Sequence, residues 1–173
     1  EYLRKFGTTK GLEMHLPYVE LAREKGFEVK LAKIEDWPFE SEKFDIISLF
    51  DVIEHIENDS AALRKIYEEL NPGGLIVISV PAFRILWSST DIVAHHFRRY
   101  RKQELRKKLE TAGFEIVKLT YFNSYLAPLI FVFLFLKRFL TFNNAIKTKL
   151  NHEYFNYSFL NNLCKNILFK EAN

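Results

Sequence analysis

Apolar residues along the first 120 positions follow two periods, one typical of strands and one typical of helices. Short alternating or continuously apolar runs predict strands, and these lie at 11–14, 27–32, 44–50, 75–80 and 114–121. Apolar residues three or four apart predict helices between them, at 17–26, 59–70 and 105–112. Strands that alternate with helices indicate an α/β fold with a mostly parallel sheet.

Polar caps and glycines set the expected ends of these helices. Asp59 or Ser60 is suited to cap the second helix, and Gly113 is suited to end the third. The runs at 44–50 and 75–80 are rich in β-branched residues, which is typical of strands buried in a parallel sheet. The expected inner faces comprise Val19, Leu21 and Ala22 in the first helix, and Leu63, Ile66, Tyr67 and Leu70 in the second.

The composition changes near residue 123. Residues 1–120 hold 19 Lys and Arg against 20 Asp and Glu, whereas 121–173 hold six against two. Nine of the 17 phenylalanines lie after residue 120. We therefore expect a domain at 1–123 and an apolar, basic helical extension at 124–173. Cys164 is the only cysteine, which excludes an intrachain disulfide and fits a cytoplasmic protein.

The extension predicts a contact surface rather than a membrane span. Its uncharged run at 125–136 would extend roughly 18 Å as a helix, short of the ~30 Å hydrocarbon core. An apolar helix with basic neighbours is typical of a peripheral anchor, so 124–149 could contact the inner face of an anionic membrane. The alternative is a helical hairpin that packs on the sheet or on a second copy in a homodimer.

The order of motifs resembles a known family. FDIISLFDVIEHI, followed by LRKIYEELNPGGLIVISVP, resembles the second half of class I S-adenosylmethionine-dependent methyltransferases. The stretch DIVAHHFRRYRKQELRKKLETAGFEI is similar to a segment of the type 11/12 subgroup, many members of which serve cell-envelope or lipid-linked biosynthesis. The resemblance covers roughly residues 1–125 and implies a Rossmann-like, doubly wound sheet.

The resemblance also implies parts that residues 1–173 do not contain. In that family a central first strand and a glycine-rich loop come before the point at which residue 1 of this chain begins to match. We therefore expect residues 1–173 to be a fragment, inactive by itself, whose parent carries about 30–60 further residues upstream.

The resemblance implies S-adenosylmethionine as the cofactor, bound at the carboxyl ends of the strands. The residues expected to contact it are Glu13, Met14, Ile34, Phe50 and Asp51. Glu13 would accept hydrogen bonds from the ribose hydroxyls, and its alternative is an exposed acid at a strand end. Met14 and Ile34 would flank the adenine, or belong to the core. Lys33 stands where the family usually carries an aspartate, which leaves one adenine contact unassigned.

His55 is a candidate catalytic base. Its imidazole could take a proton from a hydroxyl or amine acceptor, or it could pack on the cofactor without chemistry. Glu54 is adjacent to His55, so on a helix the two side chains would point about 100° apart and could not both bind the same atom.

The cationic stretch at 91–105 supplies the other candidates. His96, Arg99 and Tyr100 are expected to face the acceptor, because arginine offers a planar fork and tyrosine a hydroxyl. Alternatively, Asp91 pairs with Arg98 or Arg99, and the cluster is structural.

Neither a metal nor a nucleic acid is expected. A zinc site needs three or four convergent ligands, whereas the adjacent His95 and His96 usually face different ways and no second cysteine supports them. A basic run at 98–102 could contact nucleic acid, but the balanced charge of residues 1–120 favours other partners.

The expected function is therefore transfer of a methyl group from S-adenosylmethionine to an oxygen or nitrogen of a small or lipid-linked acceptor. The alternatives are a non-catalytic binding or scaffold module of the same fold, and a nucleic-acid methyltransferase.

Overall fold

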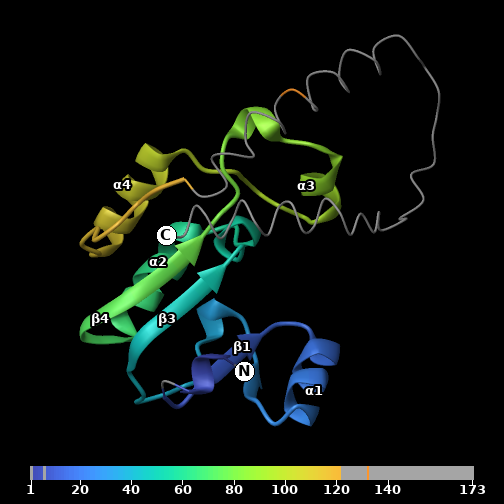
Figure 1. Cartoon of the computed structure of the whole chain (residues 1–173), viewed down its shortest axis with the longest axis vertical. Coiled ribbons are helices and arrows are strands. Elements are labelled where there is room, and N and C mark those ends of the chain that lie inside the picture. Colours follow the sequence, from blue (N-terminus) through green and yellow to red (C-terminus); the bar gives the residue numbers. More distant parts are fainter. Residues whose placement is uncertain (1, 6, 122–131, 133–173) are drawn as a thin grey trace, which may run out of the picture.

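The described part of the molecule contains two parallel β-α-β units, followed by a connection and a further helix (Figure 1). The structure is a computed structural model, and it describes residues 2–5, 7–121 and 132. A short 3₁₀ turn, Tyr2–Lys5, precedes the first unit. This unit comprises β1 (Lys10–Glu13), α1 (Leu16–Glu24) and β2 (Glu28–Leu31), and its two strands pair in parallel.

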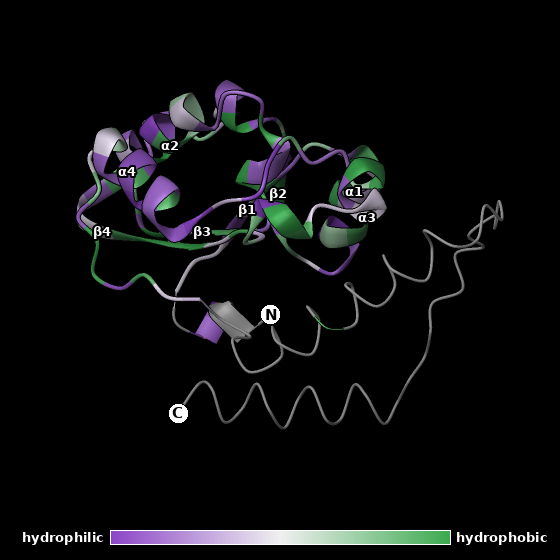
Figure 2. Cartoon of the chain, turned by 90° about the horizontal axis from the view of Figure 1, so that it is seen from above, coloured by the Kyte–Doolittle hydropathy of each residue, from purple (hydrophilic) through white to green (hydrophobic). Residues whose placement is uncertain are grey.

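The second unit carries the core. It comprises β3 (Phe44–Phe50), α2 (Asp59–Glu68) and β4 (Leu70–Ser79). β3 and β4 pair in parallel from Ile46 opposite Leu75 to Phe50 opposite Ser79. α4 (Lys102–Ala112) packs against α2, and both helices lie on the same side of these strands (Figure 2). The buried cluster between them includes Ile47, Leu49, Ile53, Leu63, Ile66, Leu105 and Leu109.

The parallel ladders confirm the α/β class expected from the sequence. Within the described residues no ladder joins β1 and β2 to β3 and β4, so each strand there has a single ladder partner. The apolar strand β3 is buried on one face only. Ile47 and Leu49 point into the core, whereas Ile46 and Phe50 are both 60 % exposed. The expectation of a buried strand is therefore met on one face of β3 only.

Several details of the helices differ from the sequence prediction, among them Tyr67, which was expected on the inner face of α2 but is exposed. The cap of α2 is Asn58, whose side chain accepts a hydrogen bond from the Ala61 amide at 3.1 Å, and not Asp59 or Ser60. Asp59 is engaged elsewhere, because its buried carboxylate binds four other side chains, those of Ser60, Arg98, Tyr100 and Lys108. Leu21 is exposed although Val19 is fully buried. Two residues along a helix correspond to a rotation of about 200°, which places Leu21 on the opposite face from Val19.

The predicted strand at 114–121 is absent. Phe114, Ile116 and Leu119 contact the core, which explains the alternating pattern, but this segment forms no ladder. A strand needs a partner for its backbone groups, and β4 pairs with β3 in the described residues. Within the described residues the second edge of β4 carries no ladder to this segment, which apolar alternation alone could not reveal. The end of α4 was predicted correctly, since Gly113 adopts φ 109° there.

The connection from β4 to α4 crosses the carboxyl ends of the strands. It contains α3 (Ser89–Val93), opened by a capping box between Ser88 and Asp91. A parallel bridge between Ala82 and Tyr100 holds the two ends of the connection together. Gly113 then closes the helix that follows.

None of the described helices is long and apolar enough to cross a membrane. The extension at 124–173 lies outside the described residues apart from Val132. The predicted boundary at residue 123, the membrane contact through 124–149 and the homodimer helices therefore remain predictions.

Candidate active site

The turn after β3 positions the candidate catalytic residues. Asp51 adopts φ 51°, a conformation that costs energy for a residue with a side chain and recurs at functional sites. Its amide donates to the Ser79 carbonyl at 3.0 Å, which fixes the turn to the end of β4. A 3₁₀ turn, Ile53–His55, follows immediately. Ile53 fills the core, so the next two side chains leave the turn beside the carboxyl ends of the strands.

Glu54 is a buried carboxylate that no other described residue satisfies. The side chain is 0 % exposed, and neither oxygen has a hydrogen-bond partner in the described structure. Burial raises the pKa of its carboxyl to about 7, and the negative charge of Asp51 adds to this shift. Buried polar groups are nearly always hydrogen-bonded, so this exception requires an explanation.

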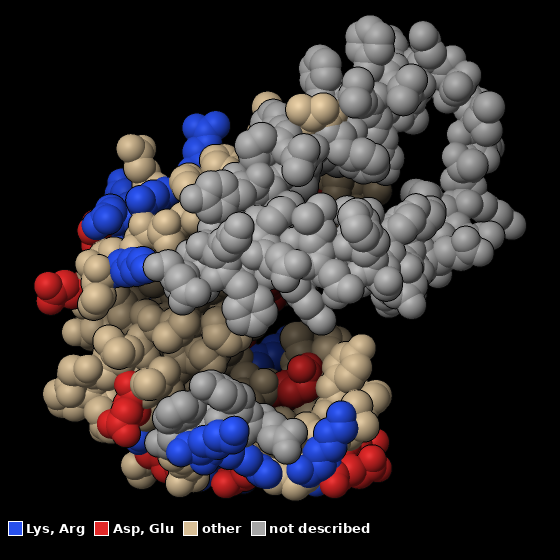
Figure 3. All heavy atoms as spheres, viewed as in Figure 1, with Lys and Arg blue, Asp and Glu red and all other residues tan. Residues whose placement is uncertain are grey.

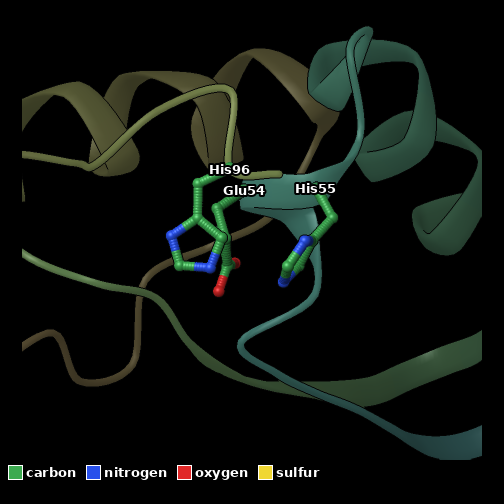
Figure 4. A group of neighbouring side chains, drawn as sticks. All are labelled: Glu54, His55 and His96. Carbon is green, nitrogen blue, oxygen red and sulfur yellow. The ribbon is translucent and has the colours of Figure 1, made fainter. Parts of the chain in front are cut away.

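His55 and His96 approach Glu54 from two different segments (Figure 4). The two rings are 4.6 Å apart between centroids and lie edge to face, at 85°. One ligand atom from each of the three residues lies within 4.8 Å of the other two. Burial, and then the neighbouring His96, lower the pKa of the His55 imidazole. The expectation that Glu54 and His55 cannot converge is wrong, because they lie on a tight turn and not on an α-helix.

Asp91 holds His96 in place. Its Oδ1 lies 3.0 Å from His96 Nδ1, and its side chain is 1 % exposed. Arg99 donates from Nε and Nη2 to the same carboxylate at 2.7 and 3.0 Å, and from Nη1 to the Ala82 carbonyl. Burial alone would raise the pKa of Asp91, but hydrogen bonds from Arg99, Ser88 and His96 hold it well below its usual range. The structure thus shows the pairing of Asp91 with Arg99 that was the structural alternative for this stretch.

Tyr100 lies in the core and not at the open edge. It is 1 % exposed, and its hydroxyl donates to Asp59 Oδ2 at 2.8 Å. This placement corrects the expectation that Tyr100 faces an acceptor beside Arg99. Neighbouring residues of an extended segment point to opposite sides, so the two side chains cannot share one direction. Arg98 and Lys108 also bind Asp59, at 2.9 and 2.8 Å.

The residues expected to contact a cofactor lie at or near strand ends. Glu13 ends β1, and its Oε1 accepts from the amides of Met14 and His15 at 2.8 and 2.9 Å. In the described structure its Oε2 accepts no hydrogen bond, which leaves it available to a ligand. Met14 is exposed, whereas Ile34 is buried in the core cluster. A place in the core is the alternative role expected for Ile34 from the sequence.

Phe50 and Asp51 close β3 on the same edge. Phe50 is exposed, and Asp51 Oδ1 lies 3.4 Å from the Ser79 hydroxyl. Both are therefore accessible to a molecule at the carboxyl ends of β3 and β4.

Two proteins are similar to this chain in sequence. One is named as a probable methyltransferase, and the other is uncharacterized. A Mycolicibacterium smegmatis protein named probable S-adenosylmethionine-dependent methyltransferase is 31 % identical over 98 residues, which is 55 % of this chain. An uncharacterized protein of Methanocaldococcus jannaschii is 29 % identical over 79 residues, or 46 % of this chain. Each match spans only 38 % of the relative's own length.

Solved structures share the fold. An S-adenosylmethionine-dependent methyltransferase of Mesorhizobium loti aligns with a TM-score of 0.56 at 16 % identity, covering 73 % of this chain and 75 % of its own. Haemonchus contortus phosphoethanolamine N-methyltransferase 2, in complex with S-adenosylmethionine, aligns with a TM-score of 0.57 at 20 % identity. That alignment covers 98 % of this chain and 41 % of the nematode chain. Such likenesses confirm the Rossmann-like fold.

The family comparison covers the part of the sequence that contains the candidate residues. A family model described as a methyltransferase domain matches residues 5–119, about two thirds of the sequence. The chain therefore belongs to the methyltransferase domain family.

Proposed function

We propose that the protein containing this chain transfers a methyl group from S-adenosylmethionine to an oxygen or nitrogen of a small or lipid-linked acceptor. The match of residues 5–119 to the methyltransferase domain model carries this proposal. The name of the Mycolicibacterium smegmatis relative and the bound cofactor of the nematode structure support it.

The strand ends offer groups that fit the cofactor. Two backbone amides hold Glu13 Oε1, and Oε2 accepts no hydrogen bond in the described structure, an arrangement suited to accepting ribose hydroxyls. The exposed side chain of Met14 would lie against the adenine, while Phe50 and Asp51 would contact the cofactor from the end of β3. When bound, S-adenosylmethionine supplies an electrophilic methyl carbon on a positively charged sulfur.

The groups beside the β3 turn would serve the acceptor. Methyl transfer is an in-line displacement, so positioning supplies much of the rate, and a hydroxyl acceptor must also lose a proton. Glu54, His55 and His96 are the polar side chains gathered at this edge. Arg99 would act as a positioning residue, because its guanidinium holds Asp91, and Asp91 holds His96.

The charges favour a small acceptor over a nucleic acid. On the face shown in Figure 3, cations gather over and beside α4, whereas acidic and basic residues are mixed around β1 and α1. A track for a phosphate backbone would need one sign of charge along the whole path.

Membrane contact through 124–149 is a further part of this proposal. Lys137, Arg138, Lys147 and Lys149 would each contribute about 1 kcal/mol at an anionic surface. Co-sedimentation of the whole protein with phosphatidylserine vesicles should fall when all four are changed to Gln. Equal sedimentation of both proteins would remove the membrane contact.

Turnover assays on the whole protein test the function. With labelled S-adenosylmethionine and a panel of hydroxyl and amine acceptors, we expect S-adenosylhomocysteine to form only when an acceptor is present. Tight cofactor binding without turnover on any acceptor would favour the non-catalytic binding module instead.

A further inference from the structure

We propose that Glu54, His55 and His96 form a binding site for one divalent metal ion of the zinc class. Nothing in the family match requires a metal, and the sequence led to the expectation of none. The proposal rests on the side chains that the turn after β3 and the 91–100 connection bring together (Figure 4). It does not depend on the proposed methyl transfer.

The spacing of the three residues suits a metal ion. Their ligand atoms lie within 4.8 Å of one another. Ligand atoms about 2.0–2.1 Å from a tetrahedral zinc ion lie about 3.4 Å apart. The group therefore closes on an ion when its ligand atoms approach one another by at most about 1.4 Å, a movement within reach of side-chain rotation.

The unsatisfied carboxylate of Glu54 points to the missing ligand. It is fully buried and has no partner among the described residues, and Figure 4 shows it between the two imidazole rings. Buried charges in proteins are paired or coordinate metals. A cation between the rings would give the carboxylate a partner and would explain why the fold tolerates it there.

His96 is oriented as metal-binding histidines are. Its Nδ1 lies 3.0 Å from Asp91 Oδ1, which leaves Nε2 as the nitrogen available to an ion. A histidine ligand almost always donates its other ring N–H to a carboxylate or carbonyl, which fixes its tautomer and increases its basicity. Arg99 fixes Asp91 in turn, through two hydrogen bonds.

The backbone explains why His96 rather than His95 joins the group. His95 adopts φ 56° and is exposed, and the turn it makes sends the next side chain inward. The Phe97 amide then donates to the Glu54 carbonyl at 2.8 Å, which fixes the distance between the two segments. The convergence is thus held by hydrogen bonds of the main chain.

The ligand types select the metal. Two imidazoles and a carboxylate suit Zn²⁺, Co²⁺, Fe²⁺ or Ni²⁺, whereas Ca²⁺ and Mg²⁺ prefer oxygen ligands throughout. Three protein ligands leave at least one position open, as in catalytic zinc sites. On the proposed function, an acceptor hydroxyl could occupy that position, where the cation would lower its pKa and so favour loss of its proton to water. His55 then serves as a ligand and not as the base expected from the sequence.

Cobalt binding by the whole, untagged protein tests the site. After removal of metal with a chelator, titration with Co²⁺ should give visible absorption bands that saturate at one ion per chain. One equivalent of Zn²⁺ should abolish them. An absence of these bands up to about 100-fold excess of Co²⁺ over protein would overturn the proposal.

Two neighbouring histidines provide a matched pair of variants. His96→Asn should weaken Co²⁺ binding by more than the ~10–100-fold typical of losing an outer partner of a ligand, whereas His95→Asn should bind like the wild type. Asparagine tolerates the positive φ at position 95, so the control variant keeps the turn. Equal loss in both variants, or none in either, would refute the assignment.

Glu54→Gln separates metal binding from folding. The side chain keeps its shape, so the metal-free variant should melt no lower than the metal-free wild type. We expect the rise in melting temperature caused by Zn²⁺ to disappear, and an undiminished rise would count against Glu54 as a ligand. S-adenosylmethionine binding and Co²⁺ binding, both measured on the wild-type protein, distinguish the two proposals. Cofactor binding without Co²⁺ binding defeats only the metal site, and the reverse result defeats only the methyl transfer.

Discussion

The amide of Phe97 donates a hydrogen bond to the carbonyl of Glu54 at 2.8 Å, across 43 positions of the sequence. This bond ties the connection between β4 and α4 to the turn after β3. It brings His96 beside His55, so that three polar side chains from two segments meet at the carboxyl ends of the strands. Ligands of open α/β sheets bind at this edge.

Asp59 should make the fold sensitive to acid. Burial alone would raise the pKa of its carboxyl, but hydrogen bonds from Lys108, Tyr100 and Arg98 outweigh it and lower that pKa. A carboxyl with a lowered folded-state pKa stabilises the protein above its unfolded pKa of about 3.9, and this contribution is lost as pH falls through the folded-state pKa. The wild type should therefore lose stability below about pH 4.

Asp59→Asn tests that network. At pH 7 it should cost about 1–3 kcal/mol in urea unfolding of the whole protein, because the partly buried Arg98 and Lys108 lose their charged partner. The loss of stability at acid pH should also become smaller. Glu110→Gln is the control, since it breaks an exposed pair with Arg106 worth about 0–1 kcal/mol. Similar small losses in both variants would show that the Asp59 network contributes little.

Tyr100→Phe should destabilise the protein without changing its chemistry. The hydroxyl donates to Asp59 inside the core, so its removal should cost about 1–3 kcal/mol of unfolding free energy. Acceptor kcat/KM should stay near the wild-type value at a temperature where both proteins are folded. A fall in kcat/KM with unchanged stability would instead restore Tyr100 to the acceptor site.

Arg99→Lys should lower turnover while cofactor affinity stays near normal. Lysine keeps the charge but cannot reproduce the two parallel hydrogen bonds to Asp91, so the carboxylate and His96 lose their fixed position. Initial rates and calorimetric titration with S-adenosylmethionine give the two readouts. A fall in cofactor affinity with turnover unchanged would place Arg99 at the cofactor.

Local patterns predicted the elements whose structure depends on neighbours in sequence. β3, β4 and the end of α4 at Gly113 follow from apolar runs and from a residue suited to positive φ. The cap of α2 was missed by one residue because Asp59 is a good cap in isolation, and only the fold shows that Tyr100 and Lys108 occupy it. The strand predicted at 114–121 is absent for a related reason. A strand ladder needs a partner that lies far away in the sequence, which a local pattern does not show.

The candidate site was harder to predict than the fold. His55 and His96 were singled out by residue type and resemblance, but Glu54 was set aside because a helix would separate it from His55. The sequence could not reveal the 3₁₀ turn at Ile53–His55 or the bond from Phe97 that makes the three side chains converge. Burial of Glu54 without a partner is a property of tertiary structure alone.

Titration of the whole protein with S-adenosylmethionine, beside its Glu13→Gln variant, tests the account most directly. Gln keeps an oxygen for the Met14 and His15 amides but removes the carboxylate that would accept ribose hydroxyls. We expect micromolar binding by the wild type, binding weaker by about 1–3 kcal/mol in Glu13→Gln, and no change in Glu20→Gln on the exposed face of α1. A folded wild type that binds no cofactor, or a Glu13→Gln variant that binds it as tightly, would contradict the account.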